Sequence, residues 1–241
     1  MLEEKMSKAR HVISKALRRS VNPLVVWSGG KDSTLMAYLV MEVVRRFRFT
    51  QPHFLVGDPF PFPTNVNFLK RLITSLGVED YTWYRDIIPP DYMAHSVRQG
   101  RPREECCFWL KVRAFNEWVK ACGFDYVLVA IRWDEHPARA KEEYFSPREE
   151  WGHVRVHPIL HFTWRDVLEF YRQHPYLLNP LYLRGYTSLG CRYCTERTID
   201  AQFSSVEEYV EYLEKHKVEE RAGRAQDKEK IMERLRKLGY F

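Results

Sequence analysis

Short apolar runs alternate with amphipathic segments along most of this chain. The runs at about 24–27, 53–56, 81–84, 126–131 and 154–156 predict buried strands. Residues 32–47, 64–76, 106–121 and 163–173 are expected to be helices, the first of them with its apolar side chains at helical spacing. Thr64 and Thr163 are expected to cap two of these helices. Strands that alternate with helices predict an α/β fold with a doubly wound parallel sheet, covered by helices on both faces.

Helices are also expected at both ends of the chain, at about 3–19, 205–219 and 226–238. Three stretches are interpreted as loops because they are rich in proline, glycine or charge: 86–105, 132–151 and 179–194. Ligands of parallel sheets bind beyond the carboxyl ends of the strands. The turn at Ser28, the loop at Asp58 and the loop at Arg132 all leave such ends, so we expect them to meet at one site.

The chain has 241 residues and a formal net charge of +6. This charge favours anionic partners such as nucleotides, sulfate or nucleic acid, without choosing among them. No apolar run approaches the roughly 18 residues that span a bilayer. The amino terminus does not lead into the apolar stretch of a signal peptide. We therefore expect a cytoplasmic protein that makes no use of a membrane.

A glycine-containing turn joins the first predicted strand to the helix that follows. It consists of Ser28, Gly29, Gly30, Lys31, Asp32 and Ser33. Glycine lets the backbone approach a ligand closely, and successive N–H groups can surround an anionic oxygen. The helix N-terminus and the Lys31 ammonium add positive charge. An ordinary strand–turn–helix junction is the alternative, but Lys-Asp-Ser at the start of the helix favours a phosphate-binding loop, although the Walker A spacing is absent.

Four of the five cysteines form two close pairs. Cys106 is adjacent to Cys107, and Cys191 and Cys194 form a Cys-x-x-Cys, whereas Cys122 stands apart and is expected to be structural. Cysteines of a cytosolic protein rarely form disulfides, so two such pairs indicate a metal site. The spacing is compatible with a [4Fe–4S] cluster or a tetrahedral zinc ion, and unliganded thiols are a third alternative.

The turn at 28–33 resembles the signature of the PP-loop ATP pyrophosphatases. Within that superfamily, roughly residues 22–241 are similar to the group of phosphoadenylyl-sulfate (PAPS) reductases and sulfate adenylyltransferase small subunits. The resemblance implies an adenine nucleotide alpha-hydrolase-like fold, with a PP-loop nucleotide-binding domain at 21–200 between an N-terminal helix at 1–20 and a C-terminal helical tail at 201–241. It also implies that ATP, adenylyl sulfate (APS) or PAPS binds at the turn, with Mg²⁺ as a companion of ATP.

The two cysteine segments extend the resemblance. Residues 106–112 resemble the tandem-cysteine helix of iron–sulfur adenylyl-sulfate reductases, and residues 185–195 are similar to the second cysteine segment of that family. This implies a [4Fe–4S] cluster, preferred over zinc, on Cys106, Cys107, Cys191 and Cys194. It also implies that Lys111 lies between the cluster and the nucleotide.

Two arginine segments resemble the same families. Residues 131–141 are similar to the Arg-x-Asp-Glu…Arg-Ala-Lys loop of the adenylyltransferase small subunit, which implies that Arg132 and Arg139, and to a lesser extent Lys141, bind sulfate or phosphate oxygens. Residues 220–224 resemble the Glu-Arg-x-Gly-Arg element of both families, which implies that Arg221 and Arg224 fold back over the nucleotide. Solvent-exposed charged segments are the alternative for both. The ending at 238–241 is similar to the Gly-Tyr-Phe terminus of the small subunit.

Asp58 occupies the place of an Asp-Thr turn of the family and is counted among the expected nucleotide-binding residues, although Pro59 follows it here. Lys31, Arg132 and Arg139 are the residues expected to be catalytic. A reductase of this family uses a cysteine nucleophile in a C-terminal segment. No cysteine follows Cys194 in this sequence, and Lys31-Asp32 is typical of enzymes that split ATP to AMP and pyrophosphate. We therefore expect ATP-dependent adenylyl transfer in preference to complete sulfonucleotide reduction.

Two other functions fit the sequence. An ATP-dependent sulfur transferase acting on tRNA or DNA would use the basic charge, although no nucleic-acid-binding module is recognisable. A non-catalytic module that senses nucleotides or redox state would keep both sites without turnover. The expected partners are an adenine nucleotide and a sulfate-like anion, together with an electron donor or a GTPase-type partner subunit, and the protein is expected to form homo-oligomers.

Overall fold

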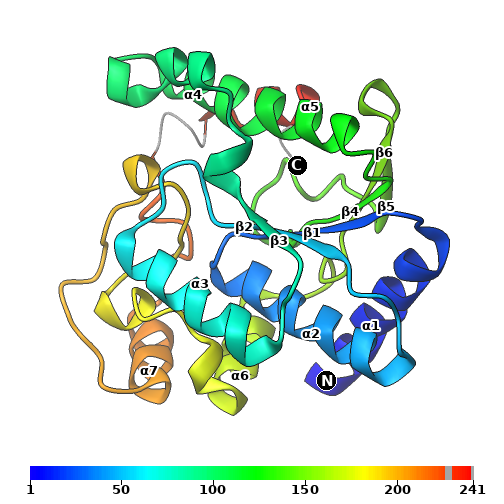
Figure 1. Ribbon diagram of the computed structural model, residues 1–241. Coiled ribbons are helices and arrows are strands. Elements are labelled where there is room, and N and C mark those ends of the chain that lie inside the picture. Colours follow the sequence, from blue (N-terminus) through cyan, green and yellow to red (C-terminus); the bar gives the residue numbers. More distant parts are fainter. Residues whose placement is uncertain (226–229, 240–241) are drawn as a thin grey trace.

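A central sheet in the order β3-β2-β1-β4-β6-β5 organises the protein (Figure 1). The computed structural model describes residues 1–225 and 230–239. Neighbouring strands are parallel, except that β5 at one edge runs antiparallel to β6. The strands are β1 Pro23–Trp27, β2 His53–Val56, β3 Tyr81–Trp83, β4 Tyr126–Leu128, β5 Phe145–Arg148 and β6 His153–Val156.

Helices cover both faces of this sheet, as the alternating pattern predicts. Figure 1 shows α4 and α5 on one face and α1, α2, α3, α6 and α7 on the other. The helices are α1 Leu2–Arg19, α2 Lys31–Phe47, α3 Pro63–Leu76, α4 Arg103–Cys107, α5 Ala114–Ala121, α6 Trp164–Gln173, α7 Val206–His216 and α9 Met232–Lys237. A π-helical stretch, Phe108–Arg113, joins α4 to α5.

The strands are apolar on both faces because both faces are buried. On β1, Val25 and Trp27 pack in the core with α1, α2 and α6, whereas Leu24 packs with α5 on the opposite face. Trp27 is fully buried, and its indole N–H donates to Thr34 Oγ1 at 3.0 Å. Burying a large apolar side chain stabilises the fold by roughly 1.5–3 kcal/mol. Trp27 therefore connects the end of β1 to the first turn of α2. The phosphate-loop residues lie between these two points in the sequence.

The order of the strands reverses at β1. The chain moves from β1 to β2 and β3 on one side, and places β4, β6 and β5 on the other. A crevice forms at such a switch point because the loops after the two central strands turn in opposite directions. The residues after β1 and β4 therefore flank the site, and those after β2 lie beside it.

Most predicted elements are confirmed within a few residues, and Thr163 caps α6 as expected, accepting the Asp166 N–H. The cap predicted at Thr64 is wrong: α3 begins at Pro63, whose missing N–H costs nothing in the first turn. The region 132–151 contains β5, and 86–105 contains short 3₁₀ turns and the start of α4, so neither is purely a loop.

The C-terminal tail is described in part. Residues 226–229 of the predicted last helix lie outside the described residues, as do Tyr240 and Phe241 of the predicted Leu-Gly-Tyr-Phe ending. The division at residues 20 and 200 stays a prediction. None of the helices in the described ranges is long and apolar enough to cross a membrane.

Candidate active site

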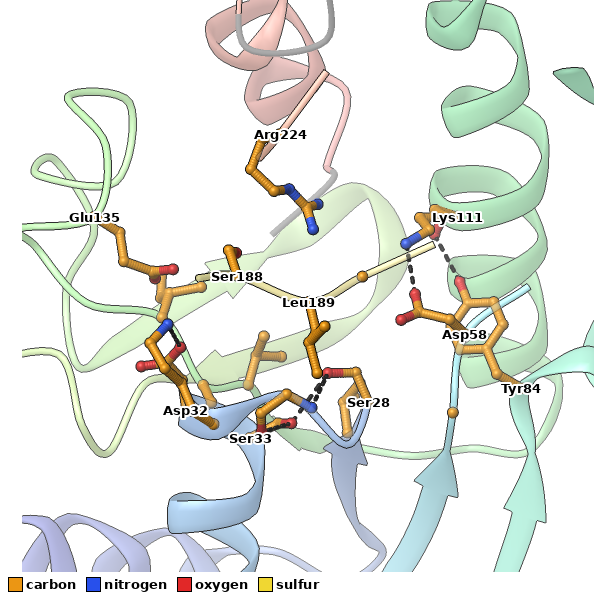
Figure 2. Close-up of a pocket in the computed structure, with 18 of the residues that line it drawn as sticks. Ser28, Asp32, Ser33, Asp58, Tyr84, Lys111, Glu135, Ser188, Leu189 and Arg224 are labelled. Atoms are coloured by element: carbon orange, nitrogen blue, oxygen red, sulfur yellow. Dashed lines mark hydrogen bonds and ion pairs between the residues drawn. The ribbon is translucent and has the colours of Figure 1, made fainter. Parts of the chain in front are cut away.

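A pocket opens at the switch point of the sheet (Figure 2). Its empty space amounts to about 1000 Å³ when the part open to solvent is included. The turn after β1, the Gly57-Asp58 turn after β2 and the residues after β4 form its walls. In Figure 2, Arg224 faces the phosphate-binding turn across the pocket, and Lys111 and Glu135 lie on opposite sides. The three strand-end loops therefore meet in space.

The phosphate-binding turn has a backbone that needs glycine. Gly29 has φ +82°, and a Cβ there would lie 2.2 Å from Asn65 Oδ1. Asn65 Nδ2 donates to the Ser28 carbonyl at 2.9 Å, and Asn179 Nδ2 donates to the Gly29 carbonyl at 3.1 Å. The two amide side chains also bond to each other at 2.7 Å. The turn is thus held from α3 and from the segment after α6.

Two buried tyrosines hold the backbone of Lys31. Its N–H donates to Tyr182 Oη at 2.9 Å, and Tyr171 Oη donates to its carbonyl at 2.5 Å. Burial raises the pKa of Tyr182 to about 12, so the phenol stays neutral. These tyrosines, like Asn65 and Asn179, were not identified from the sequence. The polar residues Asn179 and Tyr182 in the predicted loop at 179–194 are a local signal for two of the four, whereas Asn65 and Tyr171 lie within predicted helices, where no local pattern distinguishes them.

The ammonium of Lys31 is buried between carboxylates. Lys31 is 3% exposed, its Nζ lies 2.9 Å from Asp32 Oδ2, and it also pairs with Glu220. Burial opposes the charged form, but Asp32 and Glu220 outweigh it and raise the pKa of Lys31. Lys31 is therefore a permanent cation at the start of α2, on the wall of the pocket.

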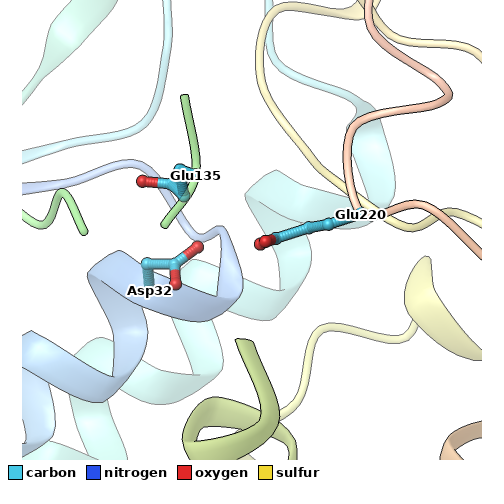
Figure 3. A group of neighbouring side chains, drawn as sticks. All are labelled: Asp32, Glu135 and Glu220. Atoms are coloured by element: carbon cyan, nitrogen blue, oxygen red, sulfur yellow. The ribbon is translucent and has the colours of Figure 1, made fainter. Parts of the chain in front are cut away.

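Asp32, Glu135 and Glu220 converge beside Lys31 from three separate parts of the chain (Figure 3). One oxygen of each lies within 4.8 Å of the others, and among the described residues this is the one group of three or more possible metal ligands that lie so close together. Burial opposes ionisation of Glu135, but Arg139 and Arg132 lower its pKa well below its ordinary value. The three carboxylates are already paired with lysine or arginine. They do not form a metal site that is ready for occupation.

Arg132 occupies a place that the sequence did not predict. Its guanidinium is fully buried and pairs with Asp32, with Glu220 at 2.6 Å and with Asp134 at 2.9 Å. Among the described residues, Arg139 lines the pocket whereas Arg132 does not. Arg132 is thus placed to hold the carboxylates of the site, and direct contact with a substrate oxyanion stays a prediction.

The other predicted arginines reach the pocket. Arg139 pairs with Glu135, and Arg221 Nη1 lies 3.5 Å from the same carboxylate. Arg224 donates to Thr195 Oγ1 at 3.1 Å and passes so close to Gly190 that a Cβ there would lie 2.4 Å from its Nη1. The segment carrying Arg221 and Arg224 therefore folds back over the phosphate-binding turn. A nucleotide-binding role for these residues stays a prediction.

Asp58 and Lys111 form an ion pair on another wall of the pocket. Lys111 Nζ donates to Asp58 Oδ1 at 2.6 Å, and Tyr84 Oη donates to the Lys111 carbonyl at 3.2 Å (Figure 2). Lys141, by contrast, is largely exposed and lies 3.7 Å from Glu233. Asp58 thus orients the ammonium that the π-helical stretch presents to the pocket.

The four paired cysteines are buried near one another. A contact between the Cys191 and Cys194 thiols, together with burial, raises the pKa of Cys191. Burial, with Cys107 and Cys194 nearby, raises the pKa of Cys106 to about 11. Lys111 lies close enough to Cys106 and Cys191 to act electrostatically on both. Cys122 is exposed. The structure therefore brings the two pairs together, with Lys111 between them and the pocket.

The pocket is strongly cationic. Of the described residues that line it, six carry positive side chains and three carry acidic ones. The cations are Lys31, Lys111, Arg139, Arg155, Arg221 and Arg224. Arginine donates two parallel hydrogen bonds to phosphate or sulfate, and lysine acts as a point charge. The arrangement suits a ligand with several anionic groups.

A parallel sheet with a glycine-lysine turn at its switch point defines an α/β protein of the PP-loop type. The family model of the phosphoadenosine phosphosulfate reductase domain matches residues 22–197. The chain belongs to that family.

Sequence relatives fall into two kinds. The adenosine 5'-phosphosulfate reductase 1 of Bacillus subtilis is 31% identical over 102 residues, a match that covers 42% of this chain and 43% of the relative. The match thus spans less than half of that reductase. Sulfate adenylyltransferase subunit 2 of Burkholderia lata is 23% identical over 100% of this chain and 99% of its own length.

Solved structures share the fold. A PAPS reductase from Candida auris, in a phosphate complex, superposes with a TM-score of 0.60 at 14% identity, covering 78% of this chain and 90% of that one. The FMN adenylyltransferase of Candida glabrata, with FMN and an ATP analogue, gives 0.58 at 16% identity, covering 81% and 64%. At these identities the likeness concerns the fold alone.

Proposed function

We propose that this protein is an ATP-dependent adenylyltransferase of sulfur metabolism, which transfers AMP to sulfate or a similar oxyanion. The observation that carries the proposal is the buried ammonium of Lys31 at the start of α2, in a pocket that also presents three arginines near the phosphate-binding turn. Backbone N–H groups and a lysine at a helix N-terminus stabilise pyrophosphate as a leaving group. APS, the product, would fit the same pocket.

In this reaction an oxyanion oxygen attacks the α-phosphorus of ATP. A new O–P bond forms, the bond from the α-phosphorus to the bridging oxygen breaks, and pyrophosphate leaves with the electron pair. Lys31 and the turn would bind pyrophosphate, and Arg139, Arg221 and Arg224 would orient the anionic groups. Arg132 would act through Asp32 and Glu220. Mg²⁺ would enter with ATP and neutralise its phosphates.

Reduction of an adenylyl sulfate is less well supported than transfer. A reductase needs a thiolate that reaches the substrate sulfur. Within the described part of the chain, the pocket wall contains no cysteine. The sequence match to sulfate adenylyltransferase subunit 2 extends over the whole chain, whereas the match to the Bacillus subtilis reductase covers 42% of it, although the reductase family model covers residues 22–197.

We propose that the four paired cysteines hold a [4Fe–4S] cluster, in preference to zinc. A zinc ion with Zn–S bonds of about 2.3 Å holds its sulfurs about 3.8 Å apart, because the site is tetrahedral. No three cysteine sulfurs of the described chain lie within 4.8 Å of one another. A cluster binds each thiolate through a different iron, so it tolerates wider spacing. Bound by Cys106, Cys107, Cys191 and Cys194, it would supply a redox-active group behind Lys111.

The name of the Burkholderia lata relative, subunit 2, supports a partner subunit for this chain, and we propose one of the GTPase type. Two other functions remain for testing: ATP-dependent sulfur transfer to tRNA or DNA, and nucleotide or redox sensing without turnover. An electron donor would be needed only for the reductase reaction.

The test is sulfate-dependent release of pyrophosphate from ATP by protein purified without oxygen, alone and with its partner subunit. We expect Lys31→Ala to weaken ATP binding about 10- to 100-fold and AMP binding little, because a charged hydrogen-bond partner of the terminal phosphates is lost. Lys70→Ala, on the exposed side of α3, is the matched control.

Other outcomes identify the alternatives. Sulfite formed from APS with added thiol would establish reduction. A salt-sensitive shift of tRNA would establish the sulfur-transferase reading. Nucleotide binding without any of these reactions would support a non-catalytic sensing function. Equal affinity for ATP and AMP would contradict the role given to Lys31.

A further inference from the structure

Arg155 is a buried arginine on the pocket wall that the proposed reaction does not use. It lies on β6, where it pairs with Val127 of β4, and its side chain packs over the ring of Phe115 on α5 at 5.4 Å. It is 1% exposed and lines the pocket. Arg155 therefore lies on the side of the pocket formed by Phe115, away from the phosphate-binding turn.

Among the described residues, the hydrogen-bond partners of Arg155 are neutral. Its Nη2 donates to Asn116 Oδ1 at 3.1 Å and to the Gly239 carbonyl at 2.8 Å. Its Nε is buried without a hydrogen-bond partner, and no carboxylate of the described residues forms an ion pair with it. Burial, with Arg148 nearby, lowers the pKa of Arg155 to about 9, and the carboxylate of Glu142, which forms no ion pair with Arg155, offsets this only in part. A buried cation is costly without a counter-charge.

Three other cations of the pocket are ion-paired: Lys31 with Asp32 and Glu220, Lys111 with Asp58, and Arg139 with Glu135. Arg224 resembles Arg155 in having a neutral partner, Thr195 Oγ1, and a buried Nε without one, but it faces the phosphate-binding turn (Figure 2). The phosphates of a nucleotide already have the turn, Lys31 and the arginines around it. The missing counter-charge of Arg155 is therefore available to a different anionic group in the same pocket.

We propose that Arg155 binds the tetrahedral oxyanion of the second substrate, a compact dianion of the sulfate class, apart from the phosphate-binding turn. The assignment rests on the proposed function for the identity of that substrate. A planar guanidinium that lines the pocket and has a buried N–H without a hydrogen-bond partner suits the oxygens of a tetrahedral anion. The side chain of Tyr84, close to Arg155 and Lys111, borders the same subsite.

The most direct test places a negative charge beside Arg155 by substitution of a neighbouring residue. In Asn116→Asp, a carboxylate of the same size would pair with Arg155 and compete with the anion. We expect the KM for sulfate, and the Kd for inorganic sulfate in calorimetry with ATP present, to rise about 10- to 100-fold, while the KM for ATP stays within about twofold. Asn67→Asp, an exposed position on α3, adds the same charge as a control.

Arg155→Lys provides an independent variant if Asn116→Asp does not fold. It keeps the charge but loses the planar fork, and we expect a rise of about tenfold in the same constants. Unchanged sulfate constants in whichever of the two variants folds would overturn the proposal.

The failure of this inference is distinguishable from failure of the proposed function. If wild type releases pyrophosphate with sulfate and both variants keep the wild-type KM for sulfate, Arg155 has no such role and adenylyl transfer stands. If wild type binds sulfate through Arg155 but releases no pyrophosphate, the subsite stands and the reaction does not. If wild type binds no sulfate, the subsite assignment is wrong.

Discussion

Arg132 shows how one residue can serve a site without facing the ligand. Its guanidinium pairs with carboxylates from the start of α2, from its own loop and from the C-terminal segment. Burial opposes the charge, and Asp32 and Glu220 raise the pKa of Arg132 well above its ordinary value. The guanidinium is fully buried and, together with Lys31, neutralises Asp32 and Glu220. The residue thus determines where Asp32 and Glu220 lie.

We expect Arg132→Met to lower the free energy of unfolding by about 3–5 kcal/mol, because removing one partner leaves buried charge uncompensated. Denaturant unfolding monitored by tryptophan fluorescence measures this change. Arg139→Met is the comparison, since Arg139 lines the pocket, and it should weaken ATP binding with a smaller loss of stability. A loss below about 1 kcal/mol in Arg132→Met would contradict the positioning role.

At the scale of elements, one helical unit connects the cysteines to the pocket. It carries Cys106 and Cys107 in α4, Lys111 in the π-helical stretch and Phe115 in α5. Arg103 Nη2 donates to the Tyr193 carbonyl at 3.2 Å, which fixes α4 against the Cys-x-x-Cys turn. π-helical turns often occur at functional sites because they change the direction of the side chains that follow. Here the stretch presents Lys111 to Asp58.

We expect Cys191→Ser to lose most of its iron and sulfide in protein purified without oxygen, because one of four ligands is removed. Cys122→Ser should retain both, since Cys122 is exposed and stands apart from the pairs. Colorimetric iron and sulfide assays with a visible absorption spectrum measure the difference. Zinc in place of iron in the wild-type protein would show that the cluster assignment is wrong.

At the scale of the whole molecule, the C-terminal segment closes the site that the first strand and helix begin. Glu220 pairs with Lys31 and Arg132, and the segment forms an isolated bridge between Arg224 and Thr195, next to Cys194. This closure joins the phosphate-binding turn, the cysteine turn and the tail. Removing these contacts should therefore increase the mobility of the C-terminal segment before it lowers the stability of the core.

We expect Glu220→Gln to increase amide hydrogen exchange in residues 219–225 at least severalfold without ATP, because two buried ion pairs lose their charge. ATP should restore part of the protection through Arg221 and Arg224. Glu219→Gln, at an exposed neighbouring position, is the matched control. Mass spectrometry of peptides measures the exchange in both variants. Equal exchange in both would show that the ion pairs of Glu220 with Lys31 and Arg132 do not hold this segment.

Much of the fold and part of the site were predictable from the sequence. The strands, the main helices and the glycine-lysine turn follow from periodicity and from the conformational freedom of glycine, which act over a few residues. The meeting of the turn, Asp58 and the loop that begins at Arg132 follows from the rule that parallel strands end at one edge, although Arg139 of that loop, and not Arg132, lines the pocket. The short antiparallel β5 was missed because its pairing with β6, and not its own pattern, makes it a strand.

The tertiary structure decided how the charges of the site are shared. Lys31 is neutralised by Glu220, Arg132 is buried behind the pocket and Arg155 has neutral partners, and none of this is visible in local spacing. Asn65, Asn179 and Tyr182 hold the phosphate-binding turn from distant parts of the chain. Such pairs depend on which side chains burial brings together, and burial depends on the packing of the whole chain. The sequence alone therefore determined a phosphate-binding turn on a parallel sheet, whereas only the tertiary structure decided which cations remain available to a second anion.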